Sequence, residues 1–381
     1  MNRRVAIAGV GLSESGAVPQ FSPYELLARA SRNALAETGL TPADIDGFAT
    51  TEMGILPPIE VAEYLGLRPT WVDGTGVGGS TWEVMAAHAV DAIAAGRADV
   101  VLLAYGSSSR SDVKKGLRSA NKSFGARGPA QFEAPFGATV AARYAMAANR
   151  HMHQYGTTVD QLATVAVEAR RFAHLNPAAE RQELISLEDV HAARMISDPF
   201  TALHCCLRSD GGAAVILVAE DRLADLPTKP VFVLGSSEAT SHSTMSEWDD
   251  FTVTPAAVTG PRAFAQAGIR PDEIDVCQIY DAFTYSVVVT LEDLGFCAKG
   301  EGGRFITDVG IGPGGGLPVN TDGGGLAACH PGMRGLFLLV EAVRQLRGEG
   351  GPRQVEDAEL ACVSGMGGWF SSSGTMILGR G

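Results

Sequence analysis

The sequence predicts an α/β fold built from two related halves. Short apolar segments rich in β-branched residues alternate with helical segments along the chain, a pattern typical of strands covered by helices. One helix–turn–strand unit also recurs in the second half of the sequence. The 381 residues are 45% hydrophobic and 19% charged, a balance that allows a sizeable buried core.

The first half opens with elements whose ends are marked by capping residues. Val5–Val10 is a short buried-strand pattern that stops at a glycine. Residues Pro23–Thr38 have helical spacing, with Ser22 as the N-cap and Gly39 as the stop. Further along, the same patterns predict a strand over Ile45–Thr50, an alanine-rich helix over Ser80–Ala95 and a strand over Asp99–Tyr105.

The second half repeats this alternation. Helices are predicted over Pro261–Ala267 and Gly335–Leu346, and strands over Val231–Leu234, Ile274–Tyr280, Leu360–Ser364 and Thr375–Leu378. The repetition extends to individual residues, because 34–46 and 263–275 both read Ala-x-Ala-x-x-Gly-x-x-Pro-x-x-Ile-Asp. Coincidence between two common helix–turn–strand units is the alternative explanation. We interpret the match as a sign of two homologous halves.

The repeat divides the chain into an N-terminal half, residues 1–226, and a C-terminal half, residues 227–381. Within the first half, residues 127–226 have no counterpart in this alternation of strands and helices. We interpret them as an insertion of loops and helices. Helical segments are expected there over Pro135–Tyr155 and Val159–Leu175. An insertion of this kind is expected to cover a site and to select its substrate.

Composition excludes several classes of function. The formal net charge of −13 disfavours binding to the phosphate backbone of nucleic acids. The six cysteines form no CxxC pair, so a zinc ribbon within this chain is not expected. Their spacing is also not that of a disulfide scaffold, so we expect the protein to be located in the reducing cytoplasm. No apolar stretch reaches the length of a membrane span, and no metal site is predicted.

Several motifs, taken in order, resemble the thiolase superfamily, and most closely its sterol-carrier-protein thiolase branch. The motifs are Gly76–Thr81 (GVGGST), His151–Gly156, Ser209–Ala214, Tyr280–Phe283 (YDAF), Asn320–Gly325, Cys329–Gly332 (CHPG) and Gly365–Gly368. Each motif alone is weak, but their order and spacing cover nearly the whole chain. The resemblance implies a five-layer αβαβα fold of two halves, an acyl-CoA substrate and a homodimer.

The sequence departs from that branch at the residues that carry its chemistry. The acyl-accepting cysteine of the family aligns with Gly76, and glycine cannot form an acyl-enzyme. The family motif His-Asp-Cys-Phe reads Tyr280-Asp281-Ala282-Phe283, so the second cysteine is also lost. The family histidine is kept as His330. Cys329 and the other cysteines are interpreted as small core residues.

The Cα–Cβ bond of a β-hydroxyacyl-CoA can still be broken without an acyl-enzyme, by a retro-aldol reaction that leaves the thioester intact. That reaction needs a proton acceptor near the β-hydroxyl and hydrogen-bond donors at the thioester oxygen. His330 and Tyr280 are the predicted catalytic residues. A tyrosine with its ordinary pKa of ~10 would need a neighbouring charge to act as a base near neutrality.

Further site residues follow from the family motifs. The oxyanion side and supporting contacts are predicted for Asp281, Gly76 and Gly367, and substrate binding for Gly78, Gly79, Ser80 and Asn320. Tyr285 is expected to be a packed aromatic. No cofactor is expected beyond the coenzyme A of the substrate.

The motif pattern resembles that of the bacterial steroid side-chain aldolases, which implies a steroid or other bulky acyl chain. It also implies a partner subunit with an OB-fold, in some cases with a zinc ribbon. Two alternatives stay open at this point. One is an acetyl-CoA acyltransferase of lipid degradation, which requires an acylated cysteine. The other is a non-catalytic subunit that binds acyl-CoA or lipid within a complex.

Overall fold

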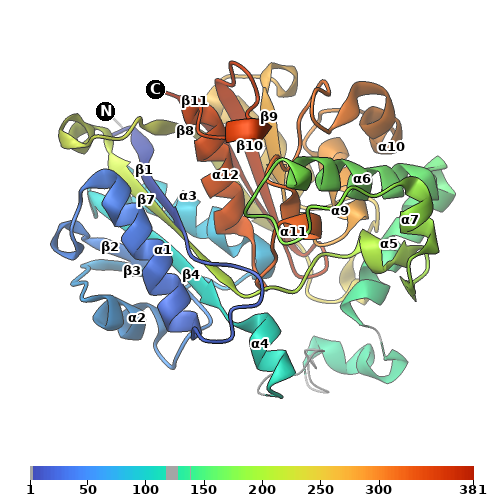
Figure 1. The fold of residues 1–381 in the computed structure, drawn as a ribbon, viewed down its shortest axis with the longest axis horizontal. Helices are drawn as coiled ribbons and strands as arrows, with labels where there is room; N and C mark the ends of the chain where they lie inside the picture. The colour runs from blue at the N-terminus through green and yellow to red at the C-terminus, as the bar shows by residue number, and fades with distance from the viewer. Residues whose placement is uncertain (1–2, 117–127, 138) are drawn as a thin grey trace.

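A computed structural model of the chain describes residues 3–116, 128–137 and 139–381. Within this part, nine strands form one mixed sheet in the order β3-β2-β4-β7-β1-β8-β11-β10-β9 (Figure 1). The N-terminal strands are β1 (Val5–Leu12), β2 (Gly47–Ala49), β3 (Trp71–Asp73), β4 (Val100–Ser107) and β7 (Gly211–Ala219). The C-terminal strands are β8 (Val231–Thr240), β9 (Val276–Ile279), β10 (Leu360–Gly367) and β11 (Ser372–Arg380).

The two halves of this sheet have the same topology. The order β2-β4-β7-β1 in the first half corresponds to β9-β10-β11-β8 in the second. In each half the first pair is parallel and the next two pairs are antiparallel. Strand β3 lies parallel to β2, and Val319 makes the corresponding parallel bridge to Cys277 in β9. The halves meet where β1 pairs with β8 over two residues of each strand.

Helices lie outside and between the two halves of the sheet. Helix α1 (Pro23–Thr38) packs on β1, β7 and β4, and α8 (Ala256–Ala267) packs on β8 and β11. Helices α3 (Thr81–Ala94) and α12 (Gly335–Arg347) each contact strands of both halves, and Figure 1 shows α12 between the N-terminal and C-terminal strands. The predicted five-layer αβαβα arrangement is confirmed in this described part of the chain.

The internal repeat has a shared physical basis. Helix α1 ends at Gly39 with φ 72° and α8 ends at Gly268 with φ 73°, a left-handed conformation that glycine adopts at little cost. The carboxylate of Asp46 accepts the backbone N–H groups at the start of β4. The carboxylate of Asp275 does the same for Leu360 at the start of β10. Matching glycines and aspartates therefore connect matching elements.

The inserted segment is shorter than predicted. Helices α5 (Val140–Tyr155), α6 (Val159–His174) and α7 (Leu187–Ala192) and the small strands β5 (Met195–Ser197) and β6 (Phe200–Thr201) lie over the C-terminal half, where α6 contacts α9 (Thr284–Asp293) and α11 (Gly324–Ala327). Residues 211–219, however, form β7 inside the main sheet. The covering segment therefore ends before Gly211, not at Leu226. Its predicted first residue, Arg127, lies outside the described residues.

Two predicted helix starts are wrong. Helix α8 begins at Ala256 and includes Pro261, because the packing of Gly260 against Leu294 and of the helix face on the sheet outweighs the local preference of proline. Helix α5 begins at Val140 after the Thr139 cap, not at Pro135.

The remaining helices are α2 (Pro57–Leu65), α4 (Ser109–Lys114) and α10 (Gly302–Phe305). Among the described helices, none is both long enough and apolar enough to cross a bilayer.

Candidate active site

Tyr280 and His330 lie against each other at the centre of the candidate site. Tyr280 follows β9, and its N–H donates to the carbonyl of Ser364 at 3.0 Å. Its ring meets that of His330 edge to face, with the centroids 5.4 Å apart and the planes at 88°. Both side chains are buried, with exposed fractions of 4% and 8%. Two residues that are distant in the sequence thus form one aromatic and imidazole pair.

His330 is fixed through its backbone, which leaves its side chain available. Its N–H donates to Ser209 Oγ at 3.2 Å, and the Ser209 N–H donates to the His330 carbonyl at 3.1 Å. The imidazole Nε2 has no hydrogen-bond partner among the described residues. A buried ring nitrogen without a partner is costly in a structural position, so this atom is suited to meet a substrate.

Asp281 supports the short helix α11, which precedes His330. Its carboxylate accepts the N–H groups of Gly325 at 2.7 Å and Leu326 at 3.1 Å. Arg334, fully buried, pairs with Asp322 at 2.6 Å and brings its Nε to 3.9 Å from Asp281. Asp281 therefore holds backbone in place, and the predicted oxyanion role of this residue stays a prediction.

The glycine turn before α3 approaches Tyr280 closely. A Cβ atom at Gly79 would lie 2.6 Å from Tyr280 Cζ and still closer to the carbonyl of Met366. A Cβ atom at Gly78 would lie 2.7 Å from the amide nitrogen of Gly368. At Gly367 it would collide with the Val77 carbonyl. Only glycine fits at these positions, because backbone of two halves meets here.

Ser80 and Asn320, both predicted to bind substrate, are engaged with protein groups. Ser80 Oγ lies 2.7 Å from Ser372 Oγ, and Ser372 donates to the Val77 carbonyl at 2.7 Å. Asn320 Oδ1 accepts the N–H of Ile279 at 2.8 Å. These contacts hold the glycine turn and the end of β9, and the role of the two residues in substrate binding stays a prediction.

The structure does not bring Gly76 into the same cluster. Gly76 is exposed, and among the described residues the only non-neighbouring atom within 4 Å of a Cβ atom built there is Thr51 Oγ1, at 3.5 Å. Gly78 and Gly79, two and three residues later, are the positions that contact Gly367 and Tyr280. A side chain at Gly76 would therefore have room but would not meet the pair.

Burial sets the protonation of the pair. Burial, followed by the charge of Arg334, lowers the pKa of His330 to about 4, so its imidazole is neutral at pH 7. Burial also raises the pKa of Tyr280 well above 10, and neighbouring ionisable groups raise it further. Tyr280 thus keeps its proton and can donate. Every neighbouring charge that acts on Tyr280 raises its pKa, so these charges do not make the phenol a base.

The cysteines are not activated for nucleophilic attack. Burial raises the pKa of Cys329, Cys205 and Cys297 to about 12 and that of Cys206 further still, whereas a catalytic thiol needs a lowered pKa. Cys329 is buried, as predicted, with its Sγ 3.5 Å from Arg334. Cys205 and Cys206 are half-buried and pack against the core, whereas Cys297 is half-buried outside that cluster, so only its assignment to the core is wrong.

Sequence reasoning missed Glu83 and Arg334. Glu83 lies on α3 with no exposed surface, and Arg334 precedes α12 and is equally buried. The available signal for Glu83 was an acid in the first turn of a helix that otherwise reads as apolar. The signal for Arg334 was a single cation next to the CHPG motif.

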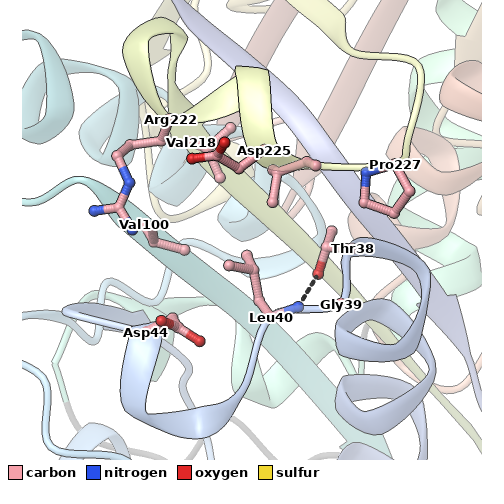
Figure 2. Close-up of a pocket in the computed structure, with 10 residues that line it drawn as sticks. Thr38, Gly39, Leu40, Asp44, Val100, Val218, Arg222, Asp225 and Pro227 are labelled. Carbon is pink, nitrogen blue, oxygen red and sulfur yellow. Dashed lines mark hydrogen bonds between the residues drawn. The ribbon is translucent and has the colours of Figure 1, made fainter.

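Two grooves in the surface lie away from Tyr280 and His330. A groove of about 340 Å³ lies where the C-terminal end of α1 meets Arg222, Asp225 and Pro227, and Figure 2 shows the residues that line it. Another, of about 290 Å³, lies along β3 near His88. Neither is lined by Tyr280 or His330. We assign the site by the chemistry of its residues, because the grooves contain no comparable cluster of unpaired buried groups.

Known proteins with the same architecture cover the whole chain. Residues 237–380 match the Thiolase C-terminal domain-like family. An acetyl-CoA acetyltransferase of Methanothermobacter thermautotrophicus is 34% identical, over 99% of this chain and 100% of its own length. The chain belongs to the thiolase superfamily. The expected family is therefore confirmed.

Two further relatives are named as aldolases. A steroid side-chain-cleaving aldolase of Thermomonospora curvata is 36% identical, over 90% of each chain. The solved structure of an Ltp2-ChsH2(DUF35) aldolase has a TM-score of 0.89 and 34% identity, and covers 99% of this chain and 98% of its own. The region matched by the family model contains Tyr280, His330 and Gly367.

Proposed function

We propose that this chain cleaves a carbon–carbon bond of a β-hydroxyacyl-CoA by a retro-aldol reaction, without an acyl-cysteine intermediate. One observation carries the proposal. A neutral histidine with an unpaired Nε2 faces a tyrosine that keeps its proton, and the thiols near them have raised pKa values. This pair offers one proton acceptor and one hydrogen-bond donor, the two groups that the reaction needs.

The steps assign a role to each residue. His330 Nε2 accepts the proton of the β-hydroxyl, and the hydroxyl oxygen becomes the carbonyl of the released ketone or aldehyde. The electron pair of the Cα–Cβ bond moves into the thioester, which becomes an enolate. Tyr280 donates a hydrogen bond to the enolate oxygen. The imidazolium then returns its proton to Cα, which yields the shortened acyl-CoA and restores the neutral imidazole.

The relatives support this reaction class and suggest its substrate. One curated relative is named a steroid side-chain-cleaving aldolase, and the solved relative is an aldolase with a DUF35 partner. By analogy, we propose a steroid or similarly bulky acyl chain and a partner subunit of the DUF35 type, with an OB-fold. The reaction as written uses no cofactor other than the coenzyme A of the substrate. The homodimer stays a prediction, which sedimentation of the purified chain tests.

The acetyltransferase named among the relatives represents the alternative function. That reaction would need a thiolate to hold the acyl group. Cys329, the cysteine next to His330, is buried beside Arg334 and has a pKa of about 12. The geometry therefore favours the lyase over the acyltransferase.

The test uses the full-length chain with and without a co-expressed DUF35-type partner. A β-hydroxyacyl-CoA with a tertiary alcohol is supplied, and the products are separated by mass. We expect a ketone and an acyl-CoA shortened by the same carbons, in equal amounts. The absence of turnover with linear, branched and steroidal substrates, with the partner present, would overturn the proposal.

A further inference from the structure

Glu83 is a buried acid that the reaction above does not use. It lies in the first turn of α3, its side chain has no exposed surface, and neither carboxyl oxygen has a hydrogen-bond partner among the described residues. Burying a polar group without a partner is unfavourable. An unfavourable group of this kind next to the candidate site suggests that Glu83 has a role in function.

The carboxyl group occupies a slot formed by glycines of other elements. A Cβ atom at Gly335, the first residue of α12, would lie 2.5 Å from Glu83 Oε2. At Gly365 in β10 it would collide with the same oxygen. At Gly374 in β11 it would lie 2.7 Å from Glu83 Cβ. The missing side chains on three elements thus make the space that this acid fills.

This slot is linked to Tyr280 through the neighbouring residues Ser80 and Gly79. Gly365 lies against both Glu83 and Ser80, and Ser80 follows Gly79, whose Cα faces the Tyr280 ring. Burial is the main cause of the raised pKa of Tyr280, and the charge of Glu83 adds to it. The protonation state of Glu83 therefore affects the pKa of the Tyr280 phenol.

In the part of the chain that the structure describes, the charged groups on the surrounding elements leave Glu83 without a counter-ion. Arg334, before α12, is committed to Asp322 and lies near Asp281. Tyr105 on β4 packs on Trp82 and donates to a backbone carbonyl. Farther along α3, His88 pairs with acids on β3 and β8, namely Asp73 and Glu238. The facing residues of β10 and β11 are glycines.

We propose that Glu83 is a positioning acid that must carry its proton during catalysis, and that its ionisation switches off Tyr280 as the pH rises. This inference rests on the proposed function, in which negative charge develops at the enolate oxygen held by Tyr280. An ionised Glu83 carboxylate, whose charge acts on the phenol of Tyr280, opposes that charge, whereas a neutral carboxyl does not. Burial supports the assignment, because it raises the pKa of Glu83 to about 8.

The test compares the pH dependence of kcat in the wild type and in Glu83→Gln, which is neutral at every pH and similar in shape. We expect the wild type to lose about tenfold of its kcat between pH 7 and pH 9, as titration near pH 8 requires. Glu83→Gln should lose less than about threefold over the same range. Equal losses in both proteins would overturn the proposal.

Glu341→Gln is the matched control, because Glu341 is a buried acid on α12 that is paired with Arg353. This variant should keep the alkaline decline of the wild type. A flattened profile in the control as well would overturn the role of Glu83, since the effect would not be specific to it.

A spectroscopic readout separates this inference from the proposed function and does not require the variant to turn over. The infrared carbonyl band of a protonated carboxylic acid should decrease in the wild type between pH 7 and pH 9. It should be missing at both pH values from Glu83→Gln or, if that variant does not fold, from Glu83→Ala. Loss of lyase activity at all pH values with this band intact would count against the proposed function only. A wild-type spectrum that is constant between pH 7 and pH 9 overturns the role of Glu83.

Discussion

The two halves of the molecule use the same scaffold for different purposes. Five residues after Asp46 the first half has Thr51, and five residues after the matching Asp275 the second half has Tyr280. Thr51 donates weakly to a neighbouring carbonyl at 3.4 Å and lies beside exposed Gly76. Tyr280 meets His330 and the glycine turn. Equivalent strand ends thus have different surroundings in the two halves, and the reaction proposed above uses only the end in the C-terminal half.

This comparison shows that a thiolase fold without the acyl-accepting cysteine can still contain a cluster of polar residues around Tyr280 and His330. The N-terminal half supplies the backbone of Gly78 and Gly79 and the buried Glu83. The C-terminal half supplies the polar side chains Tyr280, Asp281 and His330. The remaining chemistry is therefore acid–base and hydrogen-bond chemistry, which the C-terminal half can perform without a covalent intermediate.

The largest effect is expected from a substitution in the C-terminal half. His330→Ala should lower kcat by roughly 10²–10⁴-fold, because it removes the proton acceptor. In the wild type, kcat/KM should be retained down to acidic pH and fall as the pH drops through about 4, where the neutral imidazole is lost. His204→Gln is the control, since His204 is also buried with a pKa of about 4. A comparable loss in that control would contradict a specific role for His330.

Tyr280→Phe against Thr51→Val tests the equivalent positions directly. Loss of the phenol hydroxyl should cost ~2.7–4 kcal/mol of transition-state stabilisation, or about 10²–10³-fold in kcat. Its stability should change little, because the hydroxyl makes only a 3.4 Å contact with the Gly332 carbonyl. Thr51→Val should leave kcat within about twofold. Steady-state kinetics and urea unfolding measure both, and a small effect at Tyr280 would remove it from the mechanism.

The glycine turn gives a smaller, steric contrast. Gly79→Ala should destabilise the fold by about 1–3 kcal/mol and lower activity, because the added methyl group collides with Tyr280 and Met366. Gly76→Ala should be within about 0.5 kcal/mol of the wild type, because its Cβ has room. Urea denaturation of the pair checks this. Equal costs would mean that the turn packs differently from what we describe.

The smallest contrast should be between the scaffold aspartates. Asp46→Ala and Asp275→Ala each leave backbone N–H groups of a neighbouring strand unpaired, which should cost about 1–3 kcal/mol. Similar values from chemical denaturation would show that the two halves remain equivalent as scaffolds. A full loss in one half and none in the other would contradict that equivalence.

Much of this could be predicted because it is encoded locally. The repeat shows in residues 34–46 and 263–275, and the Tyr280 and His330 motifs are contiguous in sequence. The place of β7 could not be predicted, since its partners β1 and β4 are distant in the chain. The contact of Gly79 rather than Gly76 with Tyr280 depends on how backbone from the two halves meets. Glu83 was missed because helical periodicity does not reveal that the first two turns of α3, residues 81–87, are buried on all sides.

The most direct test of a lyase without an acyl-enzyme is turnover of a β-hydroxyacyl-CoA in deuterated water, with intact-protein mass spectrometry on the same sample. Our account predicts that cleavage needs no added coenzyme A, that the shortened acyl-CoA carries one deuterium at Cα, and that the protein mass is unchanged. Cleavage that depends on free coenzyme A, accompanied by an acyl adduct on Cys329, would contradict it.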